Sequence, residues 1–404
     1  MSGASASAVP PKPDGSVRAA APSGKWRRLR LIPLAAGAGA LLVGLWVGLA
    51  RLGLALPGGM PALAEFHSAL MISGFLGTVI SLERAVAIGR WWAYTAPILS
   101  AIGAVALIVG APAFASGAFL LAGIGLTFNS GTVVARQPAL FTVVLTIAAA
   151  CWVGGTFVWI KGAPAADVAG WWLAFLVLTI AAERLELSRL LSPPRSSQLT
   201  FIFAIALIII GVARGELAGE TAPFSGVGLL AVTVWLVRHD IALRTIRLSG
   251  QARFSAACLL AGYFWLGLAG LVLLIAPPGA TAFSYDAGVH AIAIGFVLSM
   301  IFGHAPIILP AVTGLRVRYS ATVYAPLVLL HFSVLLRIAA DLFERVEMRA
   351  ISGPGHDRRV CRLRGHPHDG VAKEMTRPII IERRERGLGY LKLKVIERSR
   401  SCRV

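Results

Sequence analysis

Four histidines lie inside long apolar runs of this sequence: His67, His290, His304 and His331. Imidazole is a costly side chain in hydrocarbon, and polar residues in such runs usually face the interior of a helix bundle. A neutral imidazole can ligate a metal ion, and imidazole also gains and loses protons near neutral pH. These four side chains are therefore the first candidates for chemistry.

The runs that carry these histidines are long enough to cross a membrane. Hydrophobic residues make up 57% of the chain and charged residues only 14%, whereas soluble domains are typically about half apolar and a quarter charged. Runs of about 20 apolar residues match the length of a transmembrane α-helix, and they lack the alternation of a β-barrel strand. We predict an all-α polytopic membrane protein with about eleven transmembrane helices, near residues 31–54, 61–82, 93–111, 114–134, 138–160, 167–182, 199–213, 223–241, 254–276, 287–312 and 321–343. The sixth and seventh of these spans are the shortest.

Basic residues gather at alternate ends of the predicted spans, which indicates the orientation of the chain. One side carries Lys25, Arg27, Arg28, Arg30, Arg84, Arg90, Arg136, Arg189, Arg195, Arg238, Arg244, Arg247, Arg253, Arg316 and Arg318. The opposite side carries only Arg51, Lys161 and Arg214 before the C-terminal tail. Because positive residues accumulate on the cytoplasmic side, we predict a cytoplasmic N-terminus.

Two terminal segments differ in composition from the predicted bundle of residues 31–343. Residues 1–30 are rich in Ala, Ser, Pro and Gly, and we expect a disordered tail. Residues 344–404 form a basic polar tail for which three interpretations stay open. It is an ordinary solvated tail, or the eleventh span does not cross the membrane. In the third interpretation, the sequence after about Glu347 is aberrant, as a frameshift that replaces a twelfth span would make it. Such a basic tail attracts anionic lipid or nucleic acid nonspecifically. We therefore expect the lipid bilayer as a partner and no specific binding of nucleic acid.

His67 and His290 are expected at similar depth, because the second and tenth spans begin on the same side of the membrane. At 1.5 Å per residue, His67 lies about 9 Å and His290 about 6 Å from the outer surface. Gly74 follows His67, and Gly288 and Gly295 flank His290, close to the histidine faces. A flat macrocycle between two helices needs histidines with small neighbours, and haem iron takes axial imidazole. We therefore predict that His67 and His290 either bind a b-type haem or are hydrogen-bonded packing residues.

The two other histidines cannot complete the same site. His304 lies about 21 Å along the helix from His290, and His331 falls deeper within the last span. Each fits a hydrogen-bonded packing residue, and each is also a candidate ligand for a second metal such as copper. In the last span, Arg337 and Asp341 are four residues apart and are expected to form an ion pair.

Charged residues near the predicted cytoplasmic helix ends have a simpler interpretation. Glu83 with Arg84, and the stretch "ERLELSR" of residues 183–189, are expected to form local ion pairs at the membrane interface. His239, beside Arg238 and Asp240, is expected to be interfacial.

The sequence resembles the NnrS family of bacterial membrane proteins. The similar stretches are "FHSALMISGFLGTVISLERAV", "RHDIALRTIRLSGQARFSAACLLAGYFWLGLAGL", "DAGVHAIAIGFVLSMIFGHAP" and "YAPLVLLHFSVLLRIAADL". Members of that family are similar in topology to the main subunit of haem–copper oxidases, with twelve spans, and contain haem and copper. The resemblance implies a multi-pass protein of the bacterial inner (plasma) membrane, linked to nitric-oxide stress. It also implies that His67, His290 and His304 match the family's histidines.

Two departures from the family pattern affect what the resemblance implies. The family commonly has a second histidine two residues after the first, where this chain has Ala69, and the twelfth span is replaced by the basic tail. The sixth and seventh spans contain no histidine, so a binuclear copper site of the oxidase type cannot be assembled, and oxygen reduction is not expected.

Two functional hypotheses follow. In the first, the protein binds haem through two histidines and acts in redox chemistry or in sensing, with an electron donor as partner; loss of one ligand would open the site to nitric oxide. In the second, it is a cofactor-free transporter or proton-linked permease whose histidines line a polar path, and the prolines of "GHAPIILPAVTG" interrupt one of its helices.

Overall fold

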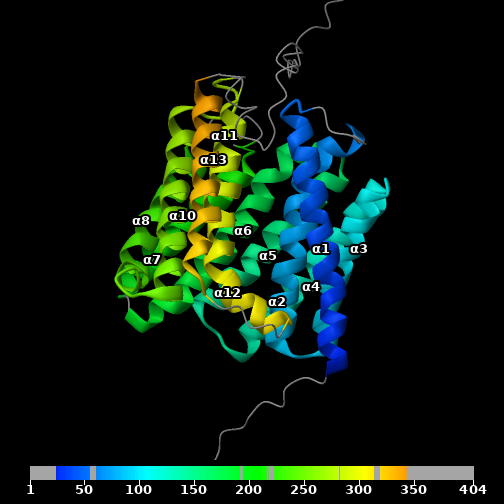
Figure 1. Cartoon of the computed structure of the whole chain (residues 1–404), viewed down its shortest axis with the longest axis horizontal. Coiled ribbons are helices and arrows are strands. Elements are labelled where there is room, and N and C mark those ends of the chain that lie inside the picture. The colour runs from blue at the N-terminus through cyan, green and yellow to red at the C-terminus, as the bar shows by residue number, and fades with distance from the viewer. Residues whose placement is uncertain are drawn as a thin grey trace, which may run out of the picture. The chain divides into compact units, whose positions relative to one another are not determined.

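The computed structural model describes residues 24–54, 61–191, 194–215, 217, 223–281, 283–313 and 319–343, and these ranges are helical almost throughout (Figure 1). They contain no β-strand, which confirms the predicted all-α class. The predicted basic tail 344–404 lies outside the described residues. So does most of the predicted N-terminal tail, but residues 24–30 belong to the first helix.

The bundle is built from long helices, several of them continued by short 3-10 or π-helical stretches. The first half comprises α1 (Gly24–Arg51), η1 (Pro61–Phe66), η2 (Ala69–Gly77), α2 (Thr78–Ile88), η3 (Trp91–Tyr94), α3 (Thr95–Ile108), α4 (Pro112–Arg136), α5 (Leu140–Ile160) and α6 (Ala165–Ser188). The second half comprises η4 (Arg189–Leu191), α7 (Arg195–Ala213), α8 (Phe224–His239), α9 (Ala242–Thr245), α10 (Gly250–Ile275), α11 (Ser284–His290), η6 (Ala291–Leu298), α12 (Ser299–Thr313), η7 (Ala321–Val323) and α13 (Tyr324–Leu342).

Ten helical segments in the described residues are long and apolar enough to cross a membrane. They correspond to ten of the eleven predicted spans and indicate a multi-pass membrane protein. The remaining predicted span, 223–241, is the apolar helix α8 of 16 residues. At 1.5 Å per residue α8 is about 24 Å long, which is shorter than about 30 Å of hydrocarbon.

The sixth span is longer than the sequence predicted. Instead of covering only residues 167–182, α6 extends over 24 residues from Ala165 to Ser188. Its apolar run ends before Glu183, but the residues that follow are mostly good helix formers, so the helix continues. Helix α6 is buried along most of its length and lies in the middle of the bundle (Figure 1).

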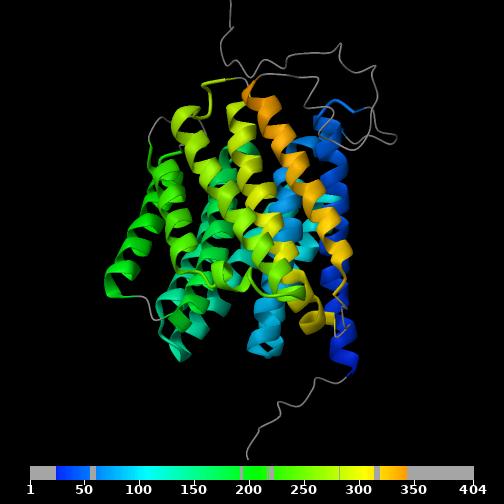
Figure 2. The ribbon, with the colours of Figure 1, turned by 60° about the vertical axis from the view of Figure 1, so that its left-hand side comes forward.

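The long helices run alternately between two ends of the bundle (Figures 1 and 2). We call the end at which α1 finishes and α11 begins the His67 end. The opposite end, at which α6 finishes and α12 lies, is the His304 end. Helices α11 and α13 lie side by side, with the start of α11 next to the end of α13.

Small residues allow α5 and α6 to approach closely. A Cβ atom on Gly155 of α5 would lie 2.6 Å from the Cβ of Trp171 and 2.9 Å from the Cδ1 of Trp172, both in α6. Such contacts are shorter than van der Waals distance, and neither tryptophan can move its inner atoms without moving the helix. Close approach at glycine is a common way for membrane helices to associate without a hydrophobic driving force.

We therefore expect Gly155→Ala to lower the stability of the protein by about 1–3 kcal/mol, the usual cost of overpacking. Thermal unfolding in detergent measures the effect. The matched control is Gly117→Ala in α4, where an added Cβ meets nothing within 4 Å. Equal melting temperatures for the two variants would contradict the packing described here.

Candidate functional site

The ring of His67 lies against two glycines of α1. Its Nδ1 is 2.8 Å from the carbonyl oxygen of Gly44, and a Cβ on Gly48 would lie 2.7 Å from its Cε1. The two glycines are four residues apart on one helix face, in the G-x-x-x-G arrangement that lets membrane helices approach closely. The Gly44 carbonyl accepts the hydrogen bond, and the absence of a side chain at Gly48 leaves room for the ring. Helix α1 therefore fixes the orientation of the His67 imidazole.

His290 is the last residue of α11, and it also bonds through Nδ1. The acceptor is the carbonyl oxygen of Asp286 one turn earlier, at 2.8 Å. The two histidines lie at the same end of the bundle, within electrostatic range of each other and of Asp286 and Arg337. The structure thus places His67 and His290 at the same end of the bundle (Figure 1), although they are more than 200 residues apart in the sequence.

Both histidines have the tautomer that suits a ligand. A carbonyl oxygen can only accept a hydrogen bond, so Nδ1 of each ring carries the proton, and in the neutral imidazole Nε2 keeps its lone pair. No residue in the described ranges hydrogen-bonds to Nε2 of His67 or His290. Metal-ligating histidines typically donate their second ring N–H in this way, which sets both the tautomer and the orientation of the ring.

Each of the two histidines lies just before a π-helical stretch, within two residues of its start. Helix η2 begins two residues after His67, and η6 begins directly after His290. π-Helices are rare and occur frequently at functional sites. In η2 the wider turn is accompanied by contacts with other helices: Ser100 of α3 donates to the carbonyl of Ser73, and Trp152 of α5 donates to the Ser73 hydroxyl. The sequence analysis did not predict these stretches.

The glycines near the two histidines have a different role from the predicted one. A Cβ on Gly74 would meet Ala40 and Ala104, one on Gly288 would meet Leu273, and one on Gly295 would lie 2.5 Å from Trp265. These three glycines pack against α1, α3 and α10, so they do not border a space for a macrocycle. For Gly74 the expectation failed because seven residues return to one face only in a regular α-helix, and the π-helix η2 changes that phase. Gly288 and Gly295 are two residues before and five residues after His290, about 200° and 140° around a regular helix, so they do not share its face.

His304 lies at the other end of the bundle and is bonded through both ring nitrogens. Its Nδ1–H donates to the carbonyl of Met300 at 2.6 Å, and Nη2 of Arg184 donates to its Nε2 at 2.6 Å. The lone pair that would bind copper is therefore already in use, and a metal would have to displace Arg184.

Arg184 belongs to a buried polar group and does not form the local ion pair that the sequence predicted for "ERLELSR". Its side chain is 7% exposed, and Nη1 is 4.0 Å from Oδ2 of Asp240, which is itself 2% exposed. Tyr263 donates to Asp240 Oδ2 at 2.8 Å, and the backbone N–H of Ala242 donates to Oδ1 at 2.7 Å. Together with His304, these residues connect α6, α10, α12 and the turn after α8.

The neighbouring His239 is also more than an interfacial residue. Its ring stacks on Trp235 with centroids 4.8 Å apart, and Ser197 lies 2.9 Å from Nε2. The sequence analysis missed Arg184, Asp240 and Tyr263 as a unit because they come from three separate helical regions. The one available signal is the presence of charged residues next to the sixth and eighth apolar runs.

His331 in α13 has the opposite tautomer. Trp265 Nε1 donates to its Nδ1 at 2.8 Å, so the proton is on Nε2, which lies 3.4 Å from the hydroxyl of Ser299. This is the hydrogen-bonding pattern of a packing residue, and copper binding by His304 or His331 stays a prediction. The described residues contain no cluster of three or more His, Cys, Asp or Glu side chains able to hold a metal ion.

The predicted ion pair in α13 is confirmed and has an additional partner. Arg337 Nε lies 3.7 Å from Oδ2 of Asp341, and its Nη2 lies 3.4 Å from Oδ2 of Asp286 in α11. The sequence predicted the first contact from the four-residue spacing. It could not predict the second, because the packing of α11 on α13 brings Asp286 into reach.

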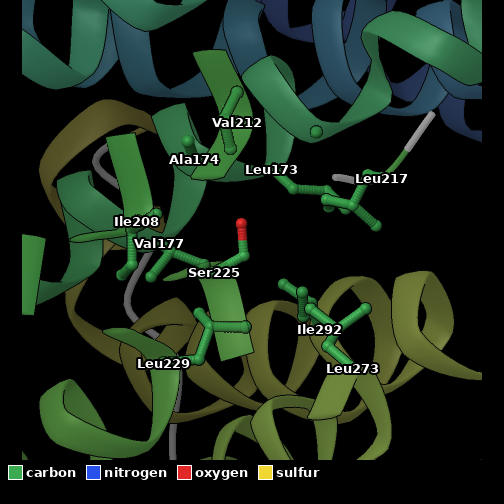
Figure 3. A pocket seen from close by; sticks show the side chains of 11 residues that line it. Leu173, Ala174, Val177, Ile208, Val212, Leu217, Ser225, Leu229, Leu273 and Ile292 are labelled. Carbon is green, nitrogen blue, oxygen red and sulfur yellow. The ribbon is translucent and has the colours of Figure 1, made fainter. Parts of the chain in front are cut away.

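A small cavity lies elsewhere, between α6, α7, α8, α10 and η6 (Figure 3). Its volume is about 20 Å³, and aliphatic side chains such as Leu173, Ile208 and Ile292 line it, with the Ser225 hydroxyl pointing inward. That volume holds about one water molecule, whereas ligand pockets usually measure about 300–1,000 Å³. The cavity is therefore too small for a porphyrin or an organic substrate.

Comparison with known proteins identifies a family for the chain. Residues 30–360 match the family described as a domain of unknown function, DUF8744. The chain belongs to this family. The match covers the whole bundle from α1 to α13, so both the His67–His290 pair and the Arg184 group lie within the DUF8744 domain. No curated protein and no solved structure matches the chain.

Gly48→Ala tests the packing of the His67 ring against α1. A Cβ 2.7 Å from Cε1 and 3.0 Å from Nδ1 must push the ring away from the Gly44 carbonyl, and we expect a loss of about 1–3 kcal/mol of stability. The control is Gly39→Ala in the same helix, where nothing lies within 4 Å. Thermal unfolding in detergent should separate the two variants; a Gly48→Ala protein as stable as the control would disprove this contact.

Asp240→Ala tests the buried group at the His304 end. Removal of the carboxylate leaves the Arg184 guanidinium, the Tyr263 hydroxyl and the Ala242 N–H without their acceptor, and breaking a buried ion pair costs about 3–5 kcal/mol. Asp167→Ala, in the exposed first turn of α6, should change stability by less than about 0.5 kcal/mol. Denaturant unfolding of both variants gives the comparison, and similar losses would argue against a special role for Asp240.

Proposed function

We propose that this chain is an integral membrane protein that binds a b-type haem through His67 and His290 and acts in electron transfer or nitric-oxide sensing. The observation that supports this proposal is that both histidines have the same tautomer, with the proton on Nδ1. Two imidazoles at one end of the bundle each donate Nδ1–H to a backbone carbonyl and keep the Nε2 lone pair available. The resemblance to the NnrS family and its oxidase-like topology points to the same cofactor.

The donor set fits haem better than it fits copper. Iron in a porphyrin needs only two protein ligands, and the ring supplies its other four. A copper site usually needs three or more protein ligands, and His304 and His331 already have bonded nitrogens. When bound, the haem would supply one-electron redox chemistry. The chain's own residues would hold the two imidazoles and exclude water from them.

We further propose that the protein lies in the bacterial inner membrane with its N-terminus in the cytoplasm. Arg84, Arg136, Arg189 and Arg238 lie within or directly after helices that finish at the His304 end, whereas Arg51, Lys161 and Arg214 are at the His67 end. Under the positive-inside rule the His304 end is cytoplasmic. The His67–His290 pair would then lie near the outer surface, where a periplasmic electron donor can approach.

Difference spectroscopy tests the proposed function. Membranes from cells that overproduce the protein should show reduced-minus-oxidised Soret and α bands of a b-type haem. His67→Ala and His290→Ala should each abolish or strongly shift these bands, because a b-type haem has no covalent tether. His239→Ala, at the other end of the bundle, should retain them.

A colourless wild-type protein would exclude the haem proposal and favour a proton-linked permease. That second function has support of its own in the Arg184–Asp240–Tyr263–His304 group, because ionisable residues inside membrane bundles often mark ion or substrate paths. The predicted interruption by Pro306 and Pro310 does not support this function, because α12 continues as a helix through both prolines to Thr313.

A further inference from the structure

The ion pair between α13 and α11 lies next to one of the two candidate ligands. Arg337 Nη2 is 3.4 Å from Asp286 Oδ2, and the side chains are 14% and 20% exposed. On the other side of the guanidinium, Nε lies 3.7 Å from Asp341, whose side chain is fully buried. A guanidinium between two carboxylates in a low-dielectric setting is strongly held, because its displacement would leave buried charge uncompensated.

Asp286 is bonded to both Arg337 and His290. Its carboxylate pairs with Arg337, and its backbone carbonyl accepts the Nδ1–H of His290 at 2.8 Å. The same residue therefore links a side chain of α13 to the imidazole of α11. Arg337 is also within electrostatic range of both His290 and His67.

The Asp286 carbonyl lies in the first turn of a long helical span. Helix α11 continues without a break through the π-helix η6 into α12, so Ser284 to Pro310 form one span. Helix ends fray more readily than helix interiors. The start of α11 lies beside the end of α13 (Figures 1 and 2), so a contact from α13 can hold the first turn in place.

We propose that Arg337 is a positioning residue for His290, acting through Asp286. The guanidinium holds the Asp286 carboxylate, and this fixes the Asp286 carbonyl to which the His290 ring is bonded. The inference rests on the proposed function only for the identity of the group that Nε2 binds. Partners of this kind orient a ligand and raise its basicity, and their loss typically weakens metal binding by about 10–100-fold.

The haem-loaded protein provides the first test, with a matched arginine as control. Arg51 is also at the His67 end and within electrostatic range of His67, but it donates a hydrogen bond to the carbonyl of Ala64 at 3.3 Å. Arg337→Gln and Arg51→Gln each remove one positive charge. Haem transfer to excess apomyoglobin should be at least about tenfold faster for Arg337→Gln than for the wild type, and within about twofold of the wild type for Arg51→Gln.

The midpoint potential separates positioning from charge alone. Loss of a nearby positive charge favours the ferric form, so both Arg→Gln variants should lower the potential. Asp286→Ala removes a negative charge and should raise it. Asp286→Ala should nevertheless accelerate haem loss as Arg337→Gln does, because both break the same link to His290. Equal haem-loss rates for Arg337→Gln and Arg51→Gln would overturn the proposal.

A second measurement uses the haem-free protein. If Arg337 acts through Asp286, the stability losses of Asp286→Ala and Arg337→Gln should not add up in the double variant. The double variant should melt at a temperature no lower than that of the less stable single variant. Additive losses would overturn the proposal. Arg337→Lys keeps the positive charge but loses the planar guanidinium with its fixed N–H donors. It replaces Arg337→Gln in this measurement if that variant does not fold, and its melting temperature should lie between those of the wild type and Arg337→Gln. A wild-type protein that never binds haem removes the proposed function and leaves this measurement valid.

Discussion

Inside a membrane, an imidazole N–H must find an acceptor within the protein, because hydrocarbon offers none. His67, His290 and His304 all place the Nδ1 proton on a backbone carbonyl, whereas His331 accepts at Nδ1 from Trp265. What then distinguishes the rings is the second nitrogen. At His304 it is bonded to Arg184, and at His331 it faces Ser299. Only at His67 and His290, among the described membrane histidines, does Nε2 have no hydrogen-bonding partner in the described ranges.

The two ends of the bundle therefore have different chemistry. At the His67 end, each of two imidazoles donates its Nδ1–H to a backbone carbonyl, and both lie within electrostatic range of Asp286 and Arg337. At the His304 end, a buried cation is shared between an imidazole and a carboxylate. The first arrangement leaves donor atoms available for a ligand. The second satisfies its charges internally and ties four helical regions together, at the cost of desolvating Arg184 and Asp240.

Helix irregularity belongs to the same arrangement. The π-helices η2 and η6 follow His67 and His290; η2 continues into α2, and η6 lies between α11 and α12. A π-helical turn alters which carbonyls find a partner within the helix, and in η2 the carbonyl of Ser73 accepts from Ser100 of α3. The change of phase also turns Gly74 toward α1 and α3. The candidate ligands thus lie where the backbone departs from regularity, as functional residues of membrane helices often do.

The sequence by itself determined the helical class, the position of ten long apolar spans and the pairing of Arg337 with Asp341. These features depend on local composition and on fixed spacing along one helix, and the shared end of His67 and His290 follows from the alternating direction of successive spans. Only the tertiary structure decided that Arg184 is buried against His304 and Asp240, that Gly44 and Gly48 seat the His67 ring, and that Asp286 joins Arg337 to His290. Each of these depends on which helices are neighbours and on the phase that the π-helical turns impose. In a chain whose helices are apolar all round, periodicity carries little information about either.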